Sequence, residues 1–200
     1  MNFQSQTLFH LFVIAFFACI FNSCQEEVYT PKPRAYFRLT VSDTTYTVYE
    51  GNEPFSFEYS LAALPDKIHP ANSSHWLNFV YPKQNAVIFT DYISLDTAKL
   101  TDLISDTRSI VLKQMVKADD MIQSEIIDTA EHIFGQIYET IGNNAACPFQ
   151  FWLTDEKNYF FRASFYLNNV PQNDSLAPII THLKKDMLHI IKTFQWKKNK

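Results

Sequence analysis

The clearest indication of the fold comes from residues 148–167, which read PFQFWLTDEKNYFFRASFYL. Two runs rich in aromatic residues, 148–153 and 160–167, enclose the polar run 155–158, which reads DEKN. Aromatic residues favour β-strands, whereas a short polar run with Asp and Asn favours a tight turn. The stretch therefore predicts a β-hairpin of two antiparallel strands.

Strand-like segments continue on the N-terminal side of this hairpin. Residues 133–141 are rich in β-favouring side chains and precede the turn signal Gly-Asn-Asn at 142–144. Further upstream, polar or proline-containing runs separate short aromatic and β-branched segments, which we expect to be strands at 36–41, 45–49, 55–59, 76–81, 86–93 and 126–127. Residues 60–74 contain prolines and an Asn-Ser-Ser run, which predicts a loop.

Two segments have the spacing of amphipathic helices. Residues 97–118 place apolar side chains three and four positions apart, and Asp96 stands where an N-cap residue belongs. A second helix is expected to begin after Asp174, since the same spacing continues from there over five turns. Pro178 falls in its first turn, where proline is tolerated.

The order of these elements is strands, helix, strands, helix. Because consecutive strands are joined by short turns, we expect an α+β fold with a mainly antiparallel sheet flanked by two long amphipathic helices. This order resembles the α/β/α sandwich of the Mog1/PsbP-like proteins. Residues 36–200 are expected to form one globular domain, because an aromatic content of 16% with only 3 glycines is typical of a packed core.

The N-terminal residues resemble a lipoprotein signal. Residues 11–21 are apolar throughout, but this run is shorter than the roughly 20 residues that cross a membrane. Cys24 follows the small Ser23, so we expect residues 1–23 to be removed as a signal peptide and the Cys24 thiol to be acylated. Residues 24–35 contain two prolines and are expected to form an extended, lipidated tether.

The same residues leave alternatives open. Residues 1–10 contain no Lys or Arg, although secretion signals usually begin with positive charge. Cys19 is a second candidate for acylation, but it lies inside the apolar run. An ordinary cleaved signal, or a buried helix with an incidental cysteine, would explain the same pattern.

Charge and cysteine content limit the classes of partner. The net charge is −4 and no basic stripe is interleaved with aromatic residues, so we expect no nucleic-acid partner. After loss of Cys19 and acylation of Cys24, Cys147 is the remaining thiol, and no intrachain disulfide is expected. Its apolar neighbours predict that Cys147 is buried.

Residues that could carry chemistry do not form a recognisable catalytic set. The six histidines are scattered, and the HExxH, P-loop and GxSxG patterns are absent. His182 and His189 are interpreted as polar edges of the second helix. Arg162 could bind an anionic ligand, but pairing with Asp or Glu across the sheet is the commoner role of a strand arginine. The sequence therefore predicts no catalytic residue, no cofactor and no metal site.

Several stretches resemble the GldD family of gliding-motility lipoproteins. The segment GNNAACPFQFWLTD at 142–155 is similar to a GNAASP-QF-LTD signature, although Asn144 lengthens it and Cys147 replaces a small residue. Matching stretches are YTPKPRAYFR at 29–38, WLNFVYPKQNAVI at 76–88, VKADD at 116–120 and DSLAPII at 174–180. The resemblance implies a part in gliding motility and the associated type IX secretion system, in a family not known as enzymes.

We expect the chain to act as an accessory or assembly subunit, held to a membrane by its lipid, with other gliding-motility or secretion proteins as partners. Its candidate contact surface comprises a turn and the polar residues near it: Gly142, Asn143, Asn144, Pro148, Gln150 and Arg162. The alternative function is binding of an envelope glycan or lipid in a pocket lined by Arg162, Trp76, Trp152 and Tyr166. Glu26 and Glu27 resemble acidic export signals of surface lipoproteins, which favours the outer membrane over the inner membrane.

Overall fold

The computed structural model describes residues 45–66 and 76–197. All of them belong to one compact unit that spans residues 36–200. The predicted signal peptide, Cys24, the tether at 24–35 and the strand at 36–41 lie outside the described residues.

Ten strands and two α-helices make up the described part of the chain. The strands are β1 Tyr46–Tyr49, β2 Phe55–Ser60, β3 Leu64–Asp66, β4 Trp76–Tyr81, β5 Ala86–Ser94, β6 Asp120–Asp128, β7 Ile133–Ile141, β8 Phe149–Thr154, β9 Tyr159–Leu167 and β10 Gln195–Trp196. The helices are α2 Leu100–Gln114, which continues into the short 3₁₀ helix η1 Met115–Lys117, and α3 Asn173–Thr193.

The strands form a seven-stranded sheet in the order β3-β4-β5-β9-β8-β7-β6 and a three-stranded sheet in the order β1-β2-β10. Every strand pair among the described residues is antiparallel. The prediction of an α+β fold with a mainly antiparallel sheet is therefore confirmed.

The predicted hairpin at 148–167 lies in the middle of the large sheet as β8 and β9. Its turn is held by one carboxylate, because Asp155 Oδ1 accepts the backbone N–H groups of Lys157, Asn158 and Tyr159 at 3.1, 2.7 and 2.8 Å. Glu156 has a φ of 62° within this turn. These bonds join residues that are close in the sequence, and Leu95 adds one from outside the hairpin by donating its backbone N–H to the carbonyl oxygen of Asn158 at 2.7 Å.

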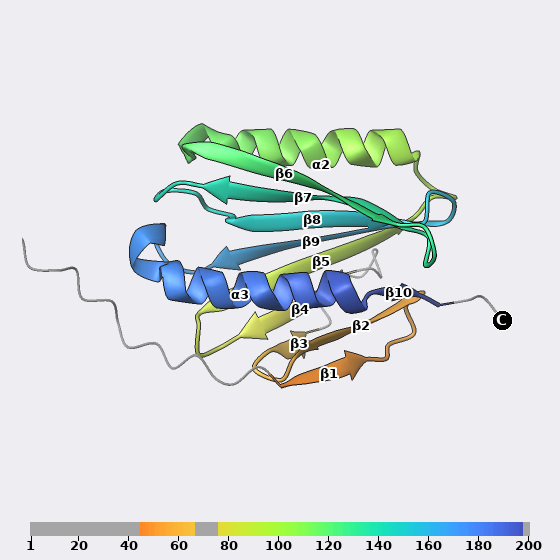
Figure 1. Ribbon diagram of the computed structural model, residues 1–200, viewed down its shortest axis with the longest axis horizontal. Helices are drawn as coiled ribbons and strands as arrows, with labels where there is room; N and C mark the ends of the chain where they lie inside the picture. Colours follow the sequence, from red (N-terminus) through yellow and green to blue (C-terminus); the bar gives the residue numbers. More distant parts are fainter. Residues whose placement is uncertain (1–44, 67–75, 198–200) are drawn as a thin grey trace, which may run out of the picture. The chain divides into compact units, whose positions relative to one another are not determined.

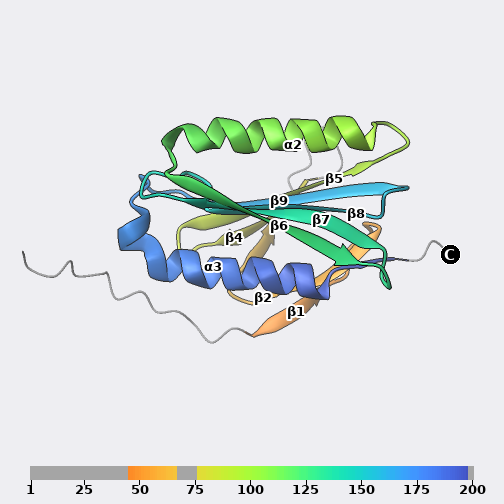
Figure 2. The same ribbon diagram turned by 45° about the horizontal axis from the view of Figure 1, so that its top comes forward.

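The two helices lie on opposite sides of the large sheet (Figures 1 and 2). On one side, Leu103 and Val111 of α2 pack against aromatic side chains of β7, β8 and β9. On the other side, α3 and the small sheet share one core with the large sheet. This core is dominated by buried aromatic residues, among them Phe55, Phe57, Phe79, Phe151, Phe161, Phe165 and Phe194.

Helix α2 begins later than the sequence predicted. Its N-cap is Lys99, which makes no side-chain capping bond, so the assignment of Asp96 as N-cap was wrong. The preceding residues instead form a turn in which Thr97 Oγ1 donates to the carbonyl oxygen of Ser94 at 2.9 Å. That turn uses the residues that would otherwise have been the first turn of the helix.

Two short strands were also missed. Residues 60–74 were predicted as a loop, but Leu64–Asp66 pairs with β4 as the edge strand β3. Proline is tolerated there because an edge strand needs hydrogen bonds on one side only. Strand β10 pairs Gln195 with Ser56 and Trp196 with Phe55. Pairing over such short segments depends on distant partners, which local sequence does not reveal.

Candidate functional site

Polar side chains form a row across four neighbouring strands on the side of the sheet that faces α2. Asn78 of β4 lies opposite Phe89 of β5, Phe89 opposite Ser164 of β9, and Ser164 opposite Gln150 of β8. Antiparallel residues directly opposite each other present their side chains on the same face. The row therefore brings two amides and a hydroxyl to the interface with the helix.

A cavity of about 300 Å³ lies between this row and α2. Thr107 and Ile110 line it from the helix. Its deeper residues are buried, with Asn78 and Gln150 each 3% exposed, whereas Phe89 and Ile110 are 42% and 39% exposed. The cavity thus opens to solvent beside Phe89 and Ile110. The other described residues that line it are Asn78, Thr90, Asp91, Gln150, Phe151, Arg162, Ser164 and Tyr166.

Arg162 and Asp91 form an ion pair in the wall of the cavity. They occupy opposite positions on β9 and β5, and Arg162 donates from Nε and Nη2 to Asp91 Oδ2 at 3.2 and 2.8 Å. The commoner role predicted for a strand arginine, pairing with a carboxylate across the sheet, is therefore confirmed. Both side chains are only partly exposed, and the positive charge of Arg162 balances the negative charge of Asp91.

Hydrogen bonds connect the C-terminal end of α2 to the sheet. Gln150 Nε2 donates to Gln114 Oε1, and Gln114 Nε2 donates to the hydroxyl of Tyr166, both at 2.6 Å. Burial raises the pKa of Tyr166 to about 12, so its hydroxyl stays protonated at physiological pH. These bonds fix the distance between helix and sheet beside the cavity.

The predicted contact turn has a structural role that the sequence did not show. Asn173 Nδ2 donates to the carbonyl oxygens of Gly142 and Ala145 at 2.8 and 3.0 Å. Asn143 Oδ1 accepts the backbone N–H of Asp174 at 3.1 Å, within the first turn of α3. The turn between β7 and β8 is thereby joined to the start of α3.

Gly142 is required in this turn for two reasons. Its φ is 137°, a backbone conformation that side-chain-bearing residues rarely adopt. A Cβ at this position would lie 2.9 Å from the backbone nitrogen of Asp119. The glycine therefore allows β7 to pass close to the chain that enters β6.

The predicted surface residues do not all lie on the surface. Pro148 and Gln150 are buried, whereas Asn144 is exposed in the turn. Gln150 and Arg162 line the cavity together, but Gly142, Asn143, Asn144 and Pro148 are not among its lining residues. Whether the turn contacts a partner stays a prediction.

The aromatic residues of the predicted pocket are only partly brought together. Tyr166 lines the cavity, whereas Trp152 is buried and stacks on Phe160 with ring centroids 5.6 Å apart. The side chain of Trp76 lies outside the described residues. Cys147 is fully buried, as predicted, and burial raises the pKa of its thiol to about 12. A thiol in that environment is not a nucleophile at physiological pH.

Several cavity residues were not recognised from the sequence. Thr107 could have been found, because it lies four residues from both Leu103 and Val111 and so interrupts the apolar stripe of α2 with a polar side chain. Asn78, Asp91 and Gln114 carry no such signal, since their positions depend on the strand register and on where α2 crosses the sheet.

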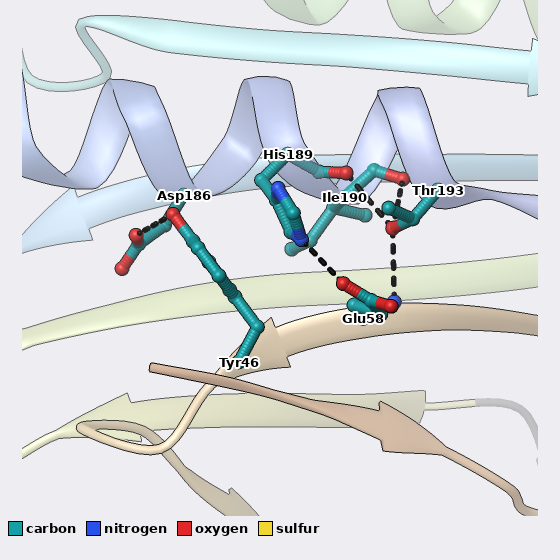
Figure 3. A network of polar contacts seen from close by, with 6 residues as sticks. All are labelled: Tyr46, Glu58, Asp186, His189, Ile190 and Thr193. Atoms are coloured by element: carbon teal, nitrogen blue, oxygen red, sulfur yellow. Dashed lines mark hydrogen bonds and ion pairs between the residues drawn. The ribbon is translucent and has the colours of Figure 1, made fainter. Parts of the chain in front are cut away.

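A second group of polar contacts joins α3 to the small sheet (Figure 3). His189 Nε2 lies 2.7 Å from Glu58 Oε2, and the His189 ring stacks on Tyr46 with centroids 3.6 Å apart. The backbone N–H of Glu58 donates to Thr193 Oγ1 at 2.9 Å. The interpretation of His189 as a mere polar edge of the helix was therefore incomplete, because it connects two elements.

Asp186 is the most deeply buried polar residue of this group, with 1% exposure. Its carboxylate accepts the hydroxyls of Tyr46 and Tyr81, each at 3.0 Å, and lies 3.8 Å from His182 Nε2. Burial raises the pKa of Asp186, although His182 and the two tyrosine hydroxyls act in the opposite direction. Its place within the apolar stripe, three residues after Leu183 and four before Ile190, was the signal in the sequence.

Two features of the described residues bear on the predicted function. Within 45–66 and 76–197, no group of three or more His, Cys, Asp or Glu side chains has the arrangement of a metal site. No helix in the same ranges combines the length and the apolar character needed to cross a bilayer.

Comparison with known proteins relates most of the chain to a family. Residues 26–196 match the family described as "Gliding motility lipoprotein GldD". No curated protein matches the chain in sequence. Among solved structures, the chain is similar to the solution structure of cyanobacterial PsbP (CyanoP) from Synechocystis sp. PCC 6803. That similarity has 9% identity, a TM-score of 0.45, and coverage of 78% of this chain and 95% of that chain.

Proposed function

We propose a function from one premise, which is that the chain belongs to the GldD family of gliding-motility lipoproteins. Membership assigns it to gliding motility and to the cell envelope. We propose further that it is a non-enzymatic accessory or assembly subunit of the gliding machinery and of its associated type IX secretion system. The family match over residues 26–196, which includes all strands and helices described above, carries this proposal.

Acylation of Cys24 is the proposed means of attachment. One acyl chain gives only marginal membrane binding, whereas the two or more chains of a lipoprotein cysteine give stable anchoring. Confinement near the membrane also raises the effective concentration of the domain for partners in the same place. The outer membrane is the proposed location, on the basis of Glu26 and Glu27 directly after the cysteine.

The turn at 142–148 is the proposed contact with a partner. Asn144 is exposed at its tip, while Asn143 and Asn173 hold the turn against α3. A loop fixed on a rigid scaffold is well suited to recognition, because little conformational entropy is lost on binding.

We also propose that the domain is an α/β/α sandwich of the Mog1/PsbP-like kind. The positions of α2 and α3 on opposite sides of the large sheet support this assignment (Figure 2). An experimental structure with a different strand order, or with both helices on one side, would contradict it.

Co-purification with crosslinking in a gliding host tests the subunit function. A tagged copy that restores gliding to a deletion strain is the bait, and Cys24→Ala is the control that lacks the acylated residue. We expect motility or secretion components with the wild-type bait and a clear loss of them with the control. Recovery of no such component by the functional bait would contradict the proposal.

The contact turn can be tested separately with a photo-crosslinking residue at Asn144. The matched control is Lys157, which is also exposed but lies in the β8–β9 turn at the other end of β8. We expect a specific adduct from position 144 and none from position 157. Adducts from both positions, or from 157 alone, would exclude the turn as the contact.

Binding of a small envelope ligand is the second candidate function. The observation that favours it is the cavity of about 300 Å³ under α2, which is lined by Arg162 and Tyr166. Ligand pockets in proteins span about 300–1,000 Å³, so this cavity is at the small end of the range.

A further inference from the structure

Most of the surface of the cavity under α2 is apolar, but polar side chains contribute to both of its walls. Thr107 replaces an apolar residue in the buried stripe of the helix, and its hydroxyl donates to the carbonyl oxygen of Leu103 at 2.8 Å. Asn78 and Gln150 occupy buried positions on the strands opposite. Interiors are normally close-packed with apolar side chains, so polar residues around a space of this size are not explained by packing.

Asn78 has an unmet hydrogen-bonding requirement. Its side chain is 3% exposed, and Oδ1 has no hydrogen-bond partner in the protein. A buried amide oxygen without a partner costs about 1–3 kcal/mol. A ligand hydroxyl or amide in the cavity would supply the missing donor.

The charges of the lining indicate a neutral ligand. Among the described residues, the lining contains one cation and one anion, Arg162 and Asp91, which form an ion pair with each other. An anionic ligand would compete with Asp91 for the guanidinium group, and a cationic ligand would compete with Arg162 for the carboxylate. A neutral hydroxylated molecule can instead use the pair as adjacent donor and acceptor without disrupting it.

The mouth of the cavity is apolar and aromatic. Phe89 and Tyr166 meet edge to face with ring centroids 5.6 Å apart, and Ile110 of α2 lies among the same lining residues. Aromatic and aliphatic groups of this kind pack against the C–H face of a ring. The site therefore has an apolar wall for a ring face and polar groups for substituents at the ring edge.

We infer that this cavity binds one neutral sugar ring, with the amide of Asn78 and the Arg162–Asp91 pair facing its hydroxyl groups and with Phe89 and Ile110 covering its apolar face. A sugar ring fits because each hydroxyl both donates and accepts, as the mixed lining requires. The inference does not rest on the subunit role, since binding is measured without any gliding protein. It rests on the second candidate function, ligand binding in this cavity, and names the class of ligand.

Other ligands fit the lining less well. A hydrocarbon chain would leave the buried Asn78 Oδ1 facing an apolar group without a hydrogen-bond donor. A charged sugar would disturb the Arg162–Asp91 pair. Both are included in the test as competing probes.

The test is a ligand titration followed by saturation-transfer NMR, using the full-length chain in phospholipid nanodiscs. The neutral probes are glucose, galactose, mannose and N-acetylglucosamine, each as free sugar and as methyl glycoside. Galacturonate and decanol are the charged and the apolar probe. If the site binds the terminal residue of an envelope glycan, the methyl glycoside should bind as tightly as the free sugar. If the site binds free sugar, the free form should bind more tightly than the methyl glycoside.

Three variants locate the binding. Asn78→Leu removes the amide, Thr107→Ile fills the cavity from the helix, and Thr140→Val is the matched control. Thr140 is 7% exposed and is not among the lining residues. Thr140→Val therefore also changes a buried threonine to an aliphatic residue, but away from the cavity. The folding of each variant is checked by its thermal unfolding transition.

We expect saturable binding of at least one neutral probe, weakened about tenfold by Asn78→Leu, which is the loss expected for one buried hydrogen bond. Thr107→Ile should weaken the same probe, and Thr140→Val should change it less than about twofold. The inference is overturned if no neutral probe binds, if galacturonate or decanol binds more tightly, or if Thr140→Val weakens binding as much as the cavity variants. If Asn78→Leu does not fold, Thr107→Ile decides the outcome.

Discussion

The side of the large sheet that faces α3 and the side that faces α2 are built from the same strands, yet they are packed differently. Toward α3, alternate residues of β8 and β9 are fully buried in an aromatic core, in which Phe161 lies 5.0 Å from Phe55 and 5.1 Å from Phe194 between ring centroids. Toward α2, the intervening residues include Gln150, Arg162 and Ser164, and a cavity is left open.

This difference indicates which side of the sheet provides stability and which side is available for binding. Close-packed aromatic residues contribute strongly to the free energy of unfolding. Buried polar residues around a space contribute less, and proteins usually retain such residues where function requires them. We therefore expect mutations on the α3 side to affect folding and mutations in the cavity to affect ligand binding.

The largest expected effect comes from Phe161→Ala on the α3 side. Removing this fully buried ring should lower the free energy of unfolding by about 3–5 kcal/mol, because it removes buried area and leaves a void. Urea unfolding followed by circular dichroism measures the change. Phe89→Ala, at the mouth of the cavity, should cost only about 1 kcal/mol. Equal losses for the two variants would contradict the proposed difference between the sides.

Asp186→Leu tests a deeply buried carboxylate on the α3 side. The substitution removes the acceptor of the Tyr46 and Tyr81 hydroxyls, and the buried Tyr81 hydroxyl is left without its partner. We expect the free energy of unfolding to fall by about 1–3 kcal/mol, measured by urea unfolding at neutral pH. An unchanged midpoint would show that the tyrosine hydroxyls find other acceptors.

The same carboxylate predicts a pH dependence with a definite sign. Its pKa is raised in the folded state, so its stabilising contribution is fully present below the ordinary pKa of 3.8 and is lost as pH rises through the folded-state value. As pH rises above about 4, the wild type should therefore lose stability relative to Asp186→Asn, which does not titrate. A difference that is constant or has the opposite slope would contradict the raised pKa.

Thr107→Ile should have a smaller effect, in the stabilising direction. The two residues have similar helix propensities, and the larger side chain enters open space next to Leu103 and Val111. Cavity filling of this kind adds about 0.5–2 kcal/mol, measurable as a higher urea midpoint. A destabilised Thr107→Ile would mean that this part of the cavity is already filled by its surroundings.

The smallest expected effect on stability is that of Arg162→Gln. Its ion pair with Asp91 is partly exposed to solvent, and such pairs contribute about 1 kcal/mol or less. We expect a small change in the urea midpoint, with salt reducing the difference from wild type because screening already weakens the pair. A loss comparable to that of Phe161→Ala would show that Arg162 is structural.

Local patterns were sufficient where neighbours in sequence make the decisive contacts. The hairpin at 148–167 has its aromatic strands on either side of a turn in which Asp155 accepts several backbone N–H groups, and α3 has its apolar stripe within one helix. They were insufficient where a distant segment supplies the partner. Strand β10 needs β2, and the start of α2 depends on a turn that competes for the same residues.

The candidate site follows the same division. Gln150 and Arg162 were recognised, because a polar residue in an aromatic strand stands out. Asn78, Asp91 and Gln114 were not, since nothing near them in the sequence shows that they meet over one cavity. The turn at 142–148 was recognised as a turn, but its attachment to Asn173 joins residues 31 and 28 positions apart.

The fold class, the central hairpin, the apolar stripes of the two helices, the burial of Cys147 and the resemblance to a family could all be predicted from the sequence. Each of these depends on residue type and short-range spacing, which fix hydrophobic periodicity and turn geometry. Three features became visible only in the tertiary structure. They are the different packing on the two sides of the sheet, the pairing of Arg162 with Asp91, and the cavity under α2. Those features depend on strand register and on the docking of a helix, and they bring together residues that are far apart along the chain.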